Sequence, residues 1–496
     1  MKKGVSDYII LYNTFYVEFI RRILMNLEAI TEMIDKLLWG WPQIIILLGT
    51  HLFMSFRTGF IQKDIFKAIK LSVAKDPEAP GDVSQFGALT TALASTVGTA
   101  NIIGVGTAVA LGGPGAVLWI WLTGIFGMAT KYAETVIALK YRVRSEDGTM
   151  LGGAMYALER GLNMRWLGII FAIFASICGL GIGCSVPANA VVSIIKTNFA
   201  HNETSAKTIT YITAVILCTL VGVAIIGGVK SITRVSEKLV PFMAIFYVLG
   251  CLTILLMNAD VMGATISTIV SAAFTTRAAG GGFIGSTISI ACRYGIARGL
   301  FSNESGMGSA PLVAVAAQTR NPKRQALVSM TGTFWDTVVV CLMTGLVLVS
   351  CIIKHPFIDG TSGNGSELSS QAFSTIPIVG NPILVIGLIT FTFSTMLGWY
   401  YYGERCAVYL FGEKAIIVYK IIWICGIFIG SVAELKLIWN IADVLNGLMT
   451  LPNIIAVLLL SKMIAAETKK YAGRHIDDKD ESEIPVIYNS RKGVLF

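Results

Sequence analysis

Apolar blocks of about 20 residues or more follow one another along almost the whole chain, with short polar segments between them. A helix needs about 20 mostly apolar residues to cross a bilayer, and lipid cannot satisfy the backbone polar groups of an open structure. The pattern therefore predicts about eleven membrane-spanning helices. We expect them at residues 37–56, 85–111, 115–141, 166–195, 208–229, 238–258, 284–317, 325–353, 376–403, 414–433 and 437–462.

The composition agrees with lipid as the main solvent of the chain. Of the 496 residues, 54% are hydrophobic and only 14% are charged, whereas about a quarter of the residues of a soluble protein carry a charge. No polar stretch is long enough to fold as a separate soluble domain. We therefore predict an all-α, multi-pass membrane protein.

Lysine and arginine gather in every second connection between the predicted spans. These connections are 57–83, 142–165, 230–238, 320–324 and the tail after Lys462. Positively charged loops mark the cytoplasmic side, so we expect a protein of the cell membrane with its amino terminus outside and its carboxyl terminus in the cytoplasm. Because the formal charge of +9 lies mostly in these loops and the tail, with no basic helix or basic and aromatic patch, we expect no nucleic-acid partner.

Two predicted spans have small and polar residues where a continuous apolar helix is expected. The second contains STVGTANIIGVG at 95–106, and the seventh contains GLFSNESGMGSAP at 299–311. Glycines alone also serve close helix packing, but polar side chains accompany them here, which favours helices broken in mid-membrane. The two breaks are five spans apart, so the second set of five begins with the opposite orientation. This predicts the 5+5 inverted repeat of a transporter with two discontinuous helices.

An unwound segment exposes backbone N–H groups on one half-helix and C=O groups on the other, which suit a carboxylate and a sodium ion respectively. In the ninth span, adjacent hydroxyls suit a hard cation, and an indole on the same helix face suits the wall of a small pocket. Ordinary packing is the alternative for that indole. The candidate substrate-binding residues are Thr99, Ala100, Asn101, Phe301, Ser302, Asn303, Gly306, Thr395 and Trp399. The candidate sodium ligands are Gly98, Ser394 and Thr395.

Charged residues also lie near the breaks. Glu304 is the only acid in the seventh-span break. It either pairs with Arg298 or Arg293 and stabilises the broken helix, or it binds a cation or a substrate ammonium group. For Asp336 the alternatives are a gating role and a structural one.

No pattern of catalytic or metal-binding residues stands out. The nine cysteines form no CxxC motif, the four histidines form no HExxH motif, and neither GxSxG nor a P-loop is present. We therefore expect no enzyme activity, and no cofactor besides sodium as a coupling ion.

Three long strings resemble the alanine or glycine:cation symporter family. They are GGPGAVLWIWLTGIFGMATKYAE, RGLFSNESGMGSAP and LGWYYYGERC, which begin at residues 112, 298 and 397. The resemblance covers nearly all of the chain outside its two ends. It implies a sodium- or proton-coupled carrier of small neutral amino acids with a LeuT-like core formed by spans two to eleven. It also implies that the substrate lies between Thr99–Asn101, Phe301–Gly306 and the pair Thr395 and Trp399.

This organisation divides the chain into four parts. They are an amphipathic amino-terminal segment (1–36), an extra transmembrane helix (37–56), the inverted-repeat transporter core (84–463) and a cytoplasmic tail (464–496). Two departures from the family pattern concern the pocket, since Ala100 replaces a usual glycine and Pro187 replaces a frequent glutamine. The methyl group of Ala100 should narrow the pocket, whereas Pro187 in place of the glutamine removes a polar contact to the substrate. If narrowing dominates, glycine and alanine remain preferred, and if the change at Pro187 dominates, another amino acid is preferred. We expect narrowing to dominate.

The leading hypothesis is a symporter that imports alanine or glycine together with sodium, by alternating access across the lipid bilayer. The alternatives are a proton-coupled or exchange carrier of another neutral amino acid, and an amino-acid sensor that binds without transporting. A channel would need a continuous polar lining, whereas the polar residues here gather at one depth.

Overall fold

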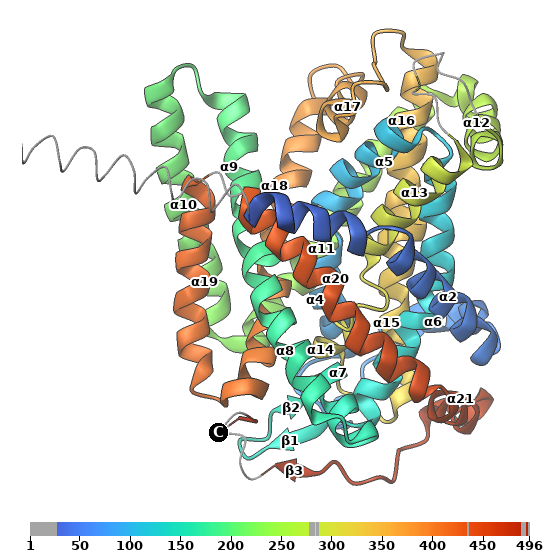
Figure 1. Ribbon diagram of the computed structural model, residues 1–496, viewed down its shortest axis with the longest axis vertical. Coiled ribbons are helices and arrows are strands. Elements are labelled where there is room, and N and C mark those ends of the chain that lie inside the picture. Colours follow the sequence, from blue (N-terminus) through green and yellow to red (C-terminus); the bar gives the residue numbers. More distant parts are fainter. Residues whose placement is uncertain (1–26, 277–282, 284–286, 434–435, 488–492, 495–496) are drawn as a thin grey trace, which may run out of the picture.

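The computed structural model describes residues 27–276, 283, 287–433, 436–487 and 493–494, and this part of the chain forms a bundle of long helices with a small sheet at one end (Figure 1). Of the predicted amphipathic segment 1–36, residues 1–26 lie outside the described part, and the helix described from Leu27 runs to a turn at Trp39. The helices are α2 (Trp41–Arg57), α3 (Ile65–Ser72), α4 (Gln85–Thr96), α5 (Val105–Gly112), α6 (Ala116–Lys140), α7 (Ala154–Tyr156), α8 (Arg165–Leu180), α9 (Val186–Phe199), α10 (Glu203–Ile226), α11 (Gly228–Met257), α12 (Met262–Phe274), α13 (Ile288–Asn303), α14 (Pro311–Ala314), α15 (Pro322–Thr333), α16 (Leu342–Lys354), α17 (Gly365–Phe373), α18 (Gly380–Phe411), α19 (Ala415–Val432), α20 (Lys436–Leu459) and α21 (Ser461–Lys470). The strands are β1 (Val143–Ser145), β2 (Met150–Leu151) and β3 (Val486–Ile487).

Nine helices of the described part are long and apolar enough to cross a membrane. The pair Gln85–Thr96 and Ala100–Gly112, bent by 54°, makes ten if it is one span. The remaining predicted span, 284–317, contains the 16-residue helix α13, then a loop, and then the four-residue α14. Helices therefore form in all eleven predicted segments, but α13 and α14 do not make a continuous span because the polar break lies between them.

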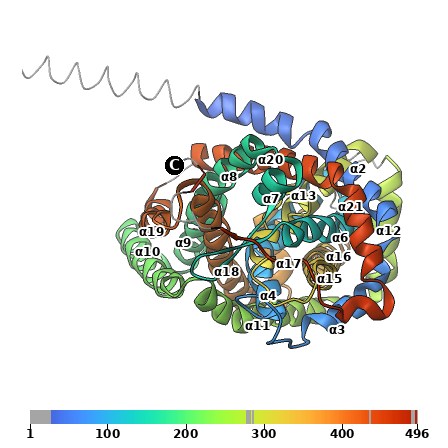
Figure 2. The same ribbon diagram turned by 90° about the horizontal axis from the view of Figure 1, so that it is seen from below.

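The helices at the edge of the bundle present apolar side chains to the surroundings. Helices α10 and α19 pack against each other at one edge (Figures 1 and 2). On α10 the exposed side chains include Val223 and Ile226, and on α19 they include Ile417 and Ile421. An outward apolar face of this kind suits lipid, because lipid offers such side chains an environment as apolar as a protein core.

The broken helices lie inside the bundle. Helix α13 packs against α5 and α6, and α18 packs against α4, α8 and α11. Two apolar cores meet on α18, which contributes Phe391 to one and Trp399 to the other. The long helix α18 is therefore the element that places its middle residues against the first break.

Local polar contacts fix where the inner helices begin. The Ser84 hydroxyl accepts a hydrogen bond from the backbone N–H of Gly87 at 2.9 Å and caps α4. Asn321 caps α15 in the same way, and Pro322 occupies the first turn, where its missing N–H costs nothing.

The tail after α21 is ordered against the end of the bundle where the sheet lies. Strand β1 pairs with β2 in antiparallel fashion and with β3 of the tail in parallel fashion. The carboxylate of Asp480 lies 3.5 Å from the Lys140 ammonium, and its backbone N–H donates to the Arg320 carbonyl at 2.8 Å. Helices α12 and α17 lie at the opposite end of the bundle (Figure 1).

Candidate functional site

The first break separates α4 from α5. Val97 has an extended backbone, with φ −75° and ψ 95°, and ends α4. The backbone N–H of Gly98 then donates to the side-chain oxygen of Asn101 at 2.8 Å. The next residues, Ala100–Gly104, form a π-helical turn, a geometry that is frequent at functional sites. This confirms an irregular helix where the sequence predicted one.

The second break follows α13. Glu304 ends this helix with a left-handed backbone at φ 52°, and Gly306 and Gly308 also have positive φ, at 92° and 79°. Glycine adopts this conformation without steric cost. A Cβ atom on Gly308 would also lie 2.8 Å from Cγ of Asn453 on α20. The glycines of this segment therefore permit both the turn and its close approach to α20.

A cavity of about 260 Å³ lies between the two breaks and α18. Eight of the residues singled out from the sequence line it: Gly98, Thr99, Ala100, Arg298, Phe301, Glu304, Thr395 and Trp399. Lining residues that the sequence reasoning did not select are Ser95, Thr96, Ile103, Gly104, Thr107, Ile182, Val186, Ala190, Thr392, Trp439 and Asp443. Pro187, noted as a departure from the family pattern, lines it as well.

Thr395 and Gly98 lie next to each other in the wall of this cavity. A Cβ atom placed on Gly98 would lie 2.9 Å from the Thr395 hydroxyl oxygen. Both hydroxyls donate to the Phe391 carbonyl, that of Thr395 at 2.9 Å and that of Ser394 at 2.8 Å. The neighbouring Ser394 does not line the cavity, and its hydroxyl lies 3.4 Å from the sulfur of Met243 on α11. Of the two adjacent hydroxyls, the cavity therefore receives that of Thr395.

Trp399 forms part of the wall one helical turn after Thr395. Its side chain is buried, and its ring meets that of Tyr402 edge-on at 5.7 Å. A Cβ atom on Gly183, in the π-helical turn between α8 and α9, would lie only 2.0 Å from Cβ of Trp399. Gly183 therefore makes the room that the indole occupies.

A buried cluster outside the cavity joins the two breaks. The Asn101 amide donates to one oxygen of the Asp336 carboxylate at 2.7 Å, and the Ser302 hydroxyl donates to the other at 2.9 Å. The Thr337 hydroxyl also donates to this second oxygen, at 2.6 Å. All four side chains are buried. Three donors on one carboxylate stabilise its charge, and they link α13 to the segment after Gly98.

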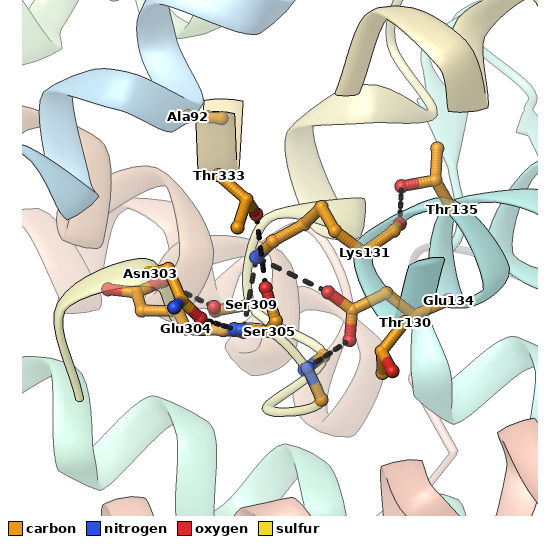
Figure 3. A network of polar contacts seen from close by, with 12 residues as sticks. Ala92, Thr130, Lys131, Glu134, Thr135, Asn303, Glu304, Ser305, Ser309 and Thr333 are labelled. Atoms are coloured by element: carbon orange, nitrogen blue, oxygen red, sulfur yellow. Dashed lines mark hydrogen bonds and ion pairs between the residues drawn. The ribbon is translucent and has the colours of Figure 1, made fainter. Parts of the chain in front are cut away.

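A second buried network fixes the loop of the second break, as Figure 3 shows. Lys131 and Glu134, one turn apart on α6, lie 3.3 Å apart, and Lys131 also donates to the Glu304 carbonyl at 3.1 Å. The other Glu134 oxygen accepts from the backbone N–H groups of Gly306 and Gly308, at 3.1 and 3.2 Å. The loop is therefore held by one ion pair on a neighbouring helix.

Asn453 of α20 completes this network. Its amide donates to Glu134 and to the Gly306 carbonyl, each at 2.9 Å. Gly306 and Asn303, which the sequence suggested as substrate-binding residues, take part in the hydrogen bonds of this loop and do not line the cavity.

The ion pairs proposed from the sequence between Glu304 and Arg298 or Arg293 do not form within the described residues. The Glu304 side chain instead accepts a hydrogen bond from Ser309.

Comparison with known proteins supports a common origin over nearly the whole chain. Residues 24–485 match the model of the sodium:alanine symporter family. The sodium/alanine symporter AgcS of Methanococcus maripaludis is 45% identical over 454 residues, which cover 90% of this chain and 98% of that protein. A protein of Haemophilus influenzae named an uncharacterized transporter is 46% identical over 464 residues, or 93% of this chain and 100% of that protein. The amino-acid carrier protein AlsT of Bacillus subtilis is 34% identical over 428 residues, covering 86% and 88%.

The solved structures support the fold predicted from the resemblance. The crystal structure of MhsT in complex with L-phenylalanine matches with a TM-score of 0.52 at 14% identity, covering 79% of this chain and 99% of that chain. MhsT has the LeuT fold. The expected LeuT-like architecture is therefore confirmed, and family and fold are those of secondary transporters and not of enzymes.

Proposed function

Because the chain belongs to the sodium:alanine symporter family, we propose that it imports a small neutral amino acid, alanine or glycine, together with sodium. That the protein is a multi-pass membrane transporter of amino acids follows from the family itself. The observation that carries the finer proposal is the cavity of about 260 Å³ bounded by both breaks and by Thr395 and Trp399. This arrangement offers backbone dipoles to an amino acid in a space of the size of a small molecule.

In this proposal the substrate carboxylate lies at the start of the second half-helix of the first break, near Thr99 and Ala100. Free backbone N–H groups and the positive end of a helix favour an anion there. Phe301 and Trp399 form apolar walls for the substrate side chain. The carboxylate of Glu304, which lines the same cavity, is the partner proposed for the substrate ammonium group.

We place the coupling sodium ion between Gly98 and Thr395. A hard cation prefers oxygen ligands, and the Thr395 hydroxyl lies beside the backbone of Gly98 in the wall of the cavity. Asn101, Ser302 and Asp336 then act as a support that holds the two breaks in register, since their contacts lie behind the cavity wall.

We propose that the end of the bundle with the sheet and the tail faces the cytoplasm, with the amino terminus outside. The loops predicted as cytoplasmic lie at this end, and the tail residue Asp480 contacts the loop residue Arg320 there. This orientation follows the distribution of lysine and arginine.

A proton-coupled carrier is the second candidate, and Glu304 favours it. A carboxyl group that lines the cavity at membrane depth can take up and release a proton. Sodium is preferred because Glu304 is already assigned to the substrate ammonium group, whereas the Thr395 hydroxyl can ligate a cation through its oxygen but does not ionise near neutral pH.

Uptake of labelled alanine into proteoliposomes tests the proposal. We expect accumulation under an inward sodium gradient, and none when choline replaces sodium at the same membrane potential. Accumulation that needs an inward proton gradient and ignores sodium would support the second candidate. Binding of alanine without uptake under either gradient would indicate a sensor and would overturn both.

A further inference from the structure

The tail after α21 runs along the end of the bundle that carries the sheet, which we place in the cytoplasm. In Figure 1 it passes from α21 along this end to β3. Its first part is anchored by Ile476, which is buried in the apolar core that α6 and α15 share. The Asn321 amide, just before α15, donates to the Ile476 carbonyl at 2.8 Å. The tail therefore starts from a fixed point on the α15 side of the bundle.

Two acids then attach the tail to the ends of α6 and α15. The Asp477 carboxylate pairs with Arg324, in the first turn of α15, whose side chain is 8% exposed. The Asp480 carboxylate lies 3.5 Å from the ammonium group of Lys140, the last residue of α6. This part of the tail is acidic, since residues 477–483 contain five acids and one lysine. Opposite charges therefore hold it against the two helix ends.

The end of the tail contacts the other side of the bundle. The backbone N–H of Val494 donates to the carbonyl of Tyr409, near the end of α18, at 2.9 Å. The Val494 carbonyl accepts a hydrogen bond from Arg165, the first residue of α8, at 2.6 Å. Tyr409 and Phe171 of α8 belong to a second apolar core, distinct from that of α6 and α15. The tail therefore connects two groups of helices that pack in different cores.

Between these attachments the tail bounds a cavity of about 640 Å³. The bundle side of this cavity includes Lys140, Arg142 and Arg320, and the tail side consists of residues 479–484 and Val486. The Val486 side chain of β3 is 43% exposed. A polar space of this size holds water, so this part of the tail is not packed as a core. Its polar contacts can be exchanged for contacts with water, and each exposed ion pair contributes little free energy.

We propose that the tail is a strap that keeps the cytoplasmic end of the transporter closed, and that it detaches at one of its two attachments when this end opens. The inference rests on the proposed function, because alternating access requires the two groups of helices to separate here. A strap attached to both groups opposes that separation. Contacts that exist only in the closed state shift the equilibrium toward it.

Access to Ala92 from the cytoplasm measures the opening of this end. Ala92 lies on α4, between the start of that helix at Gln85 and the first break after Thr96, and it is half-buried. Inside-out membrane vesicles that contain the full-length Ala92→Cys protein are treated with a membrane-impermeant maleimide in the presence of sodium and alanine. The labelling rate of the same protein without Ala92→Cys is subtracted.

The first variant weakens the attachment to α6 and α15. Asp477→Asn combined with Asp480→Asn removes both acids that pair with these helices. We expect Ala92→Cys to be labelled about tenfold faster in this variant, which corresponds to a shift of about 1.4 kcal/mol in the opening equilibrium. Sodium-driven uptake of alanine by the same protein shows that it is folded.

The matched control is Asp478→Asn combined with Glu481→Gln. It removes the same two negative charges from the same segment, so the approach of the reagent is affected equally. The Asp478 carboxylate contacts His475 of the tail itself, and Glu481 forms no ion pair within the part of the chain that the structure describes. We expect this control to be labelled at the wild-type rate.

A second variant, Arg165→Gln, weakens the attachment at the other end of the tail, since it removes the donor to the Val494 carbonyl. Its control is Arg160→Gln, because Arg160 is exposed and has no ion pair among the described residues. We expect Arg165→Gln to accelerate labelling as well. Combining it with Asp477→Asn and Asp480→Asn should add little, since a strap released at one end no longer opposes opening. Accelerations that multiply would mean independent local loosening and would contradict the strap.

The remaining outcomes separate the strap from the proposed function. Equal labelling of the Asp477 and Asp480 double variant and its control would overturn the strap, and intact alanine uptake would then leave the proposed function standing. Labelling that stays at the subtracted background in every protein would also overturn the strap, and absent uptake would in addition contradict the proposed function. Because the two attachments are tested by separate variants, either variant that reaches the membrane as folded protein is sufficient.

Discussion

The side-chain amide of Asn101, just after the first break, lies 2.7 Å from a carboxylate oxygen of Asp336, beyond the second break. Ser302, at the end of α13, donates to the other oxygen of the same carboxylate at 2.9 Å. One buried acid therefore joins the two discontinuous helices. A movement of one break that alters this contact has to involve the other.

Replacing Asp336 by asparagine tests this link. The variant removes the charge that three donors share, and a buried hydrogen bond to a charged group contributes about 1.5 to 3 kcal/mol. We expect initial alanine uptake in proteoliposomes to fall by about tenfold or more, since about 1.4 kcal/mol corresponds to a factor of ten.

The matched control for this prediction is Asp260→Asn. Asp260 is paired with Lys354 at 2.6 Å, and its side chain is largely exposed. An exposed ion pair contributes about 0 to 1 kcal/mol, so this variant should transport as the wild type does. Equal uptake by the two variants would show that Asp336 does not couple the breaks.

The Lys131 and Glu134 pair should behave as one unit in stability. Removing one partner leaves the other charge buried and unpaired, which costs about 3 to 5 kcal/mol. We expect Lys131→Met and Glu134→Gln each to lower the unfolding temperature of the purified protein strongly. The fall in unfolding temperature of the double variant should be clearly smaller than the sum of the two single falls, because neither charge then remains without a partner. Strictly additive losses would mean that the two groups do not depend on each other.

Gly183→Ala should disturb the transport pocket although no polar group is lost. The new Cβ atom would lie 2.0 Å from Cβ of Trp399, and overpacking of this kind costs about 1 to 3 kcal/mol. We expect the indole to shift, and the pattern of inhibition of alanine uptake by other neutral amino acids to change. Gly222→Ala is the control, since its Cβ atom would meet only Ile424 Cδ1 at 3.6 Å. If Gly183→Ala and Gly222→Ala give the same inhibition pattern, Trp399 does not determine which amino acids are selected.

The hydroxyls of Thr395 and Ser394 should differ in their effect on sodium dependence. Thr395 lines the cavity, whereas Ser394 is directed toward Met243 on α11. We expect Thr395→Ala to raise the sodium concentration for half-maximal uptake by about tenfold, the effect of losing about 1.4 kcal/mol. Ser394→Ala should leave it nearly unchanged. A larger rise in this sodium concentration for Ser394→Ala than for Thr395→Ala would place the ion on the face of α18 that carries Ser394.

The sequence predicted the breaks because their signal is local. Glycines and small polar residues stand together within a few positions of Gly98 and Glu304, and no distant partner is needed to see them. The choice between Ser394 and Thr395 was harder, since one residue turns a helix by about 100°, so their neighbours had to be known first.

The long-range contacts were beyond the sequence pattern. Asn101 and Asp336 are 235 positions apart, and nothing in the sequence near either residue identifies the other as its partner. Lys131 and Glu134 did offer a signal, because two charged side chains one turn apart inside an apolar block cost free energy and therefore mark a structural or functional role. Their partners, the backbone N–H groups of Gly306 and Gly308, could not be identified without the fold.

The measurement that tests sodium coupling most directly is sodium movement driven by alanine. Proteoliposomes are prepared with equal sodium on both sides, and an inward alanine gradient is imposed while labelled sodium is followed. We predict a transient net entry of sodium although no sodium gradient drives it, which requires that both solutes share one transport cycle. The entry should be much smaller in Thr395→Ala at the same sodium concentration. Alanine entry without any sodium movement in the wild type would contradict the sodium-coupled mechanism.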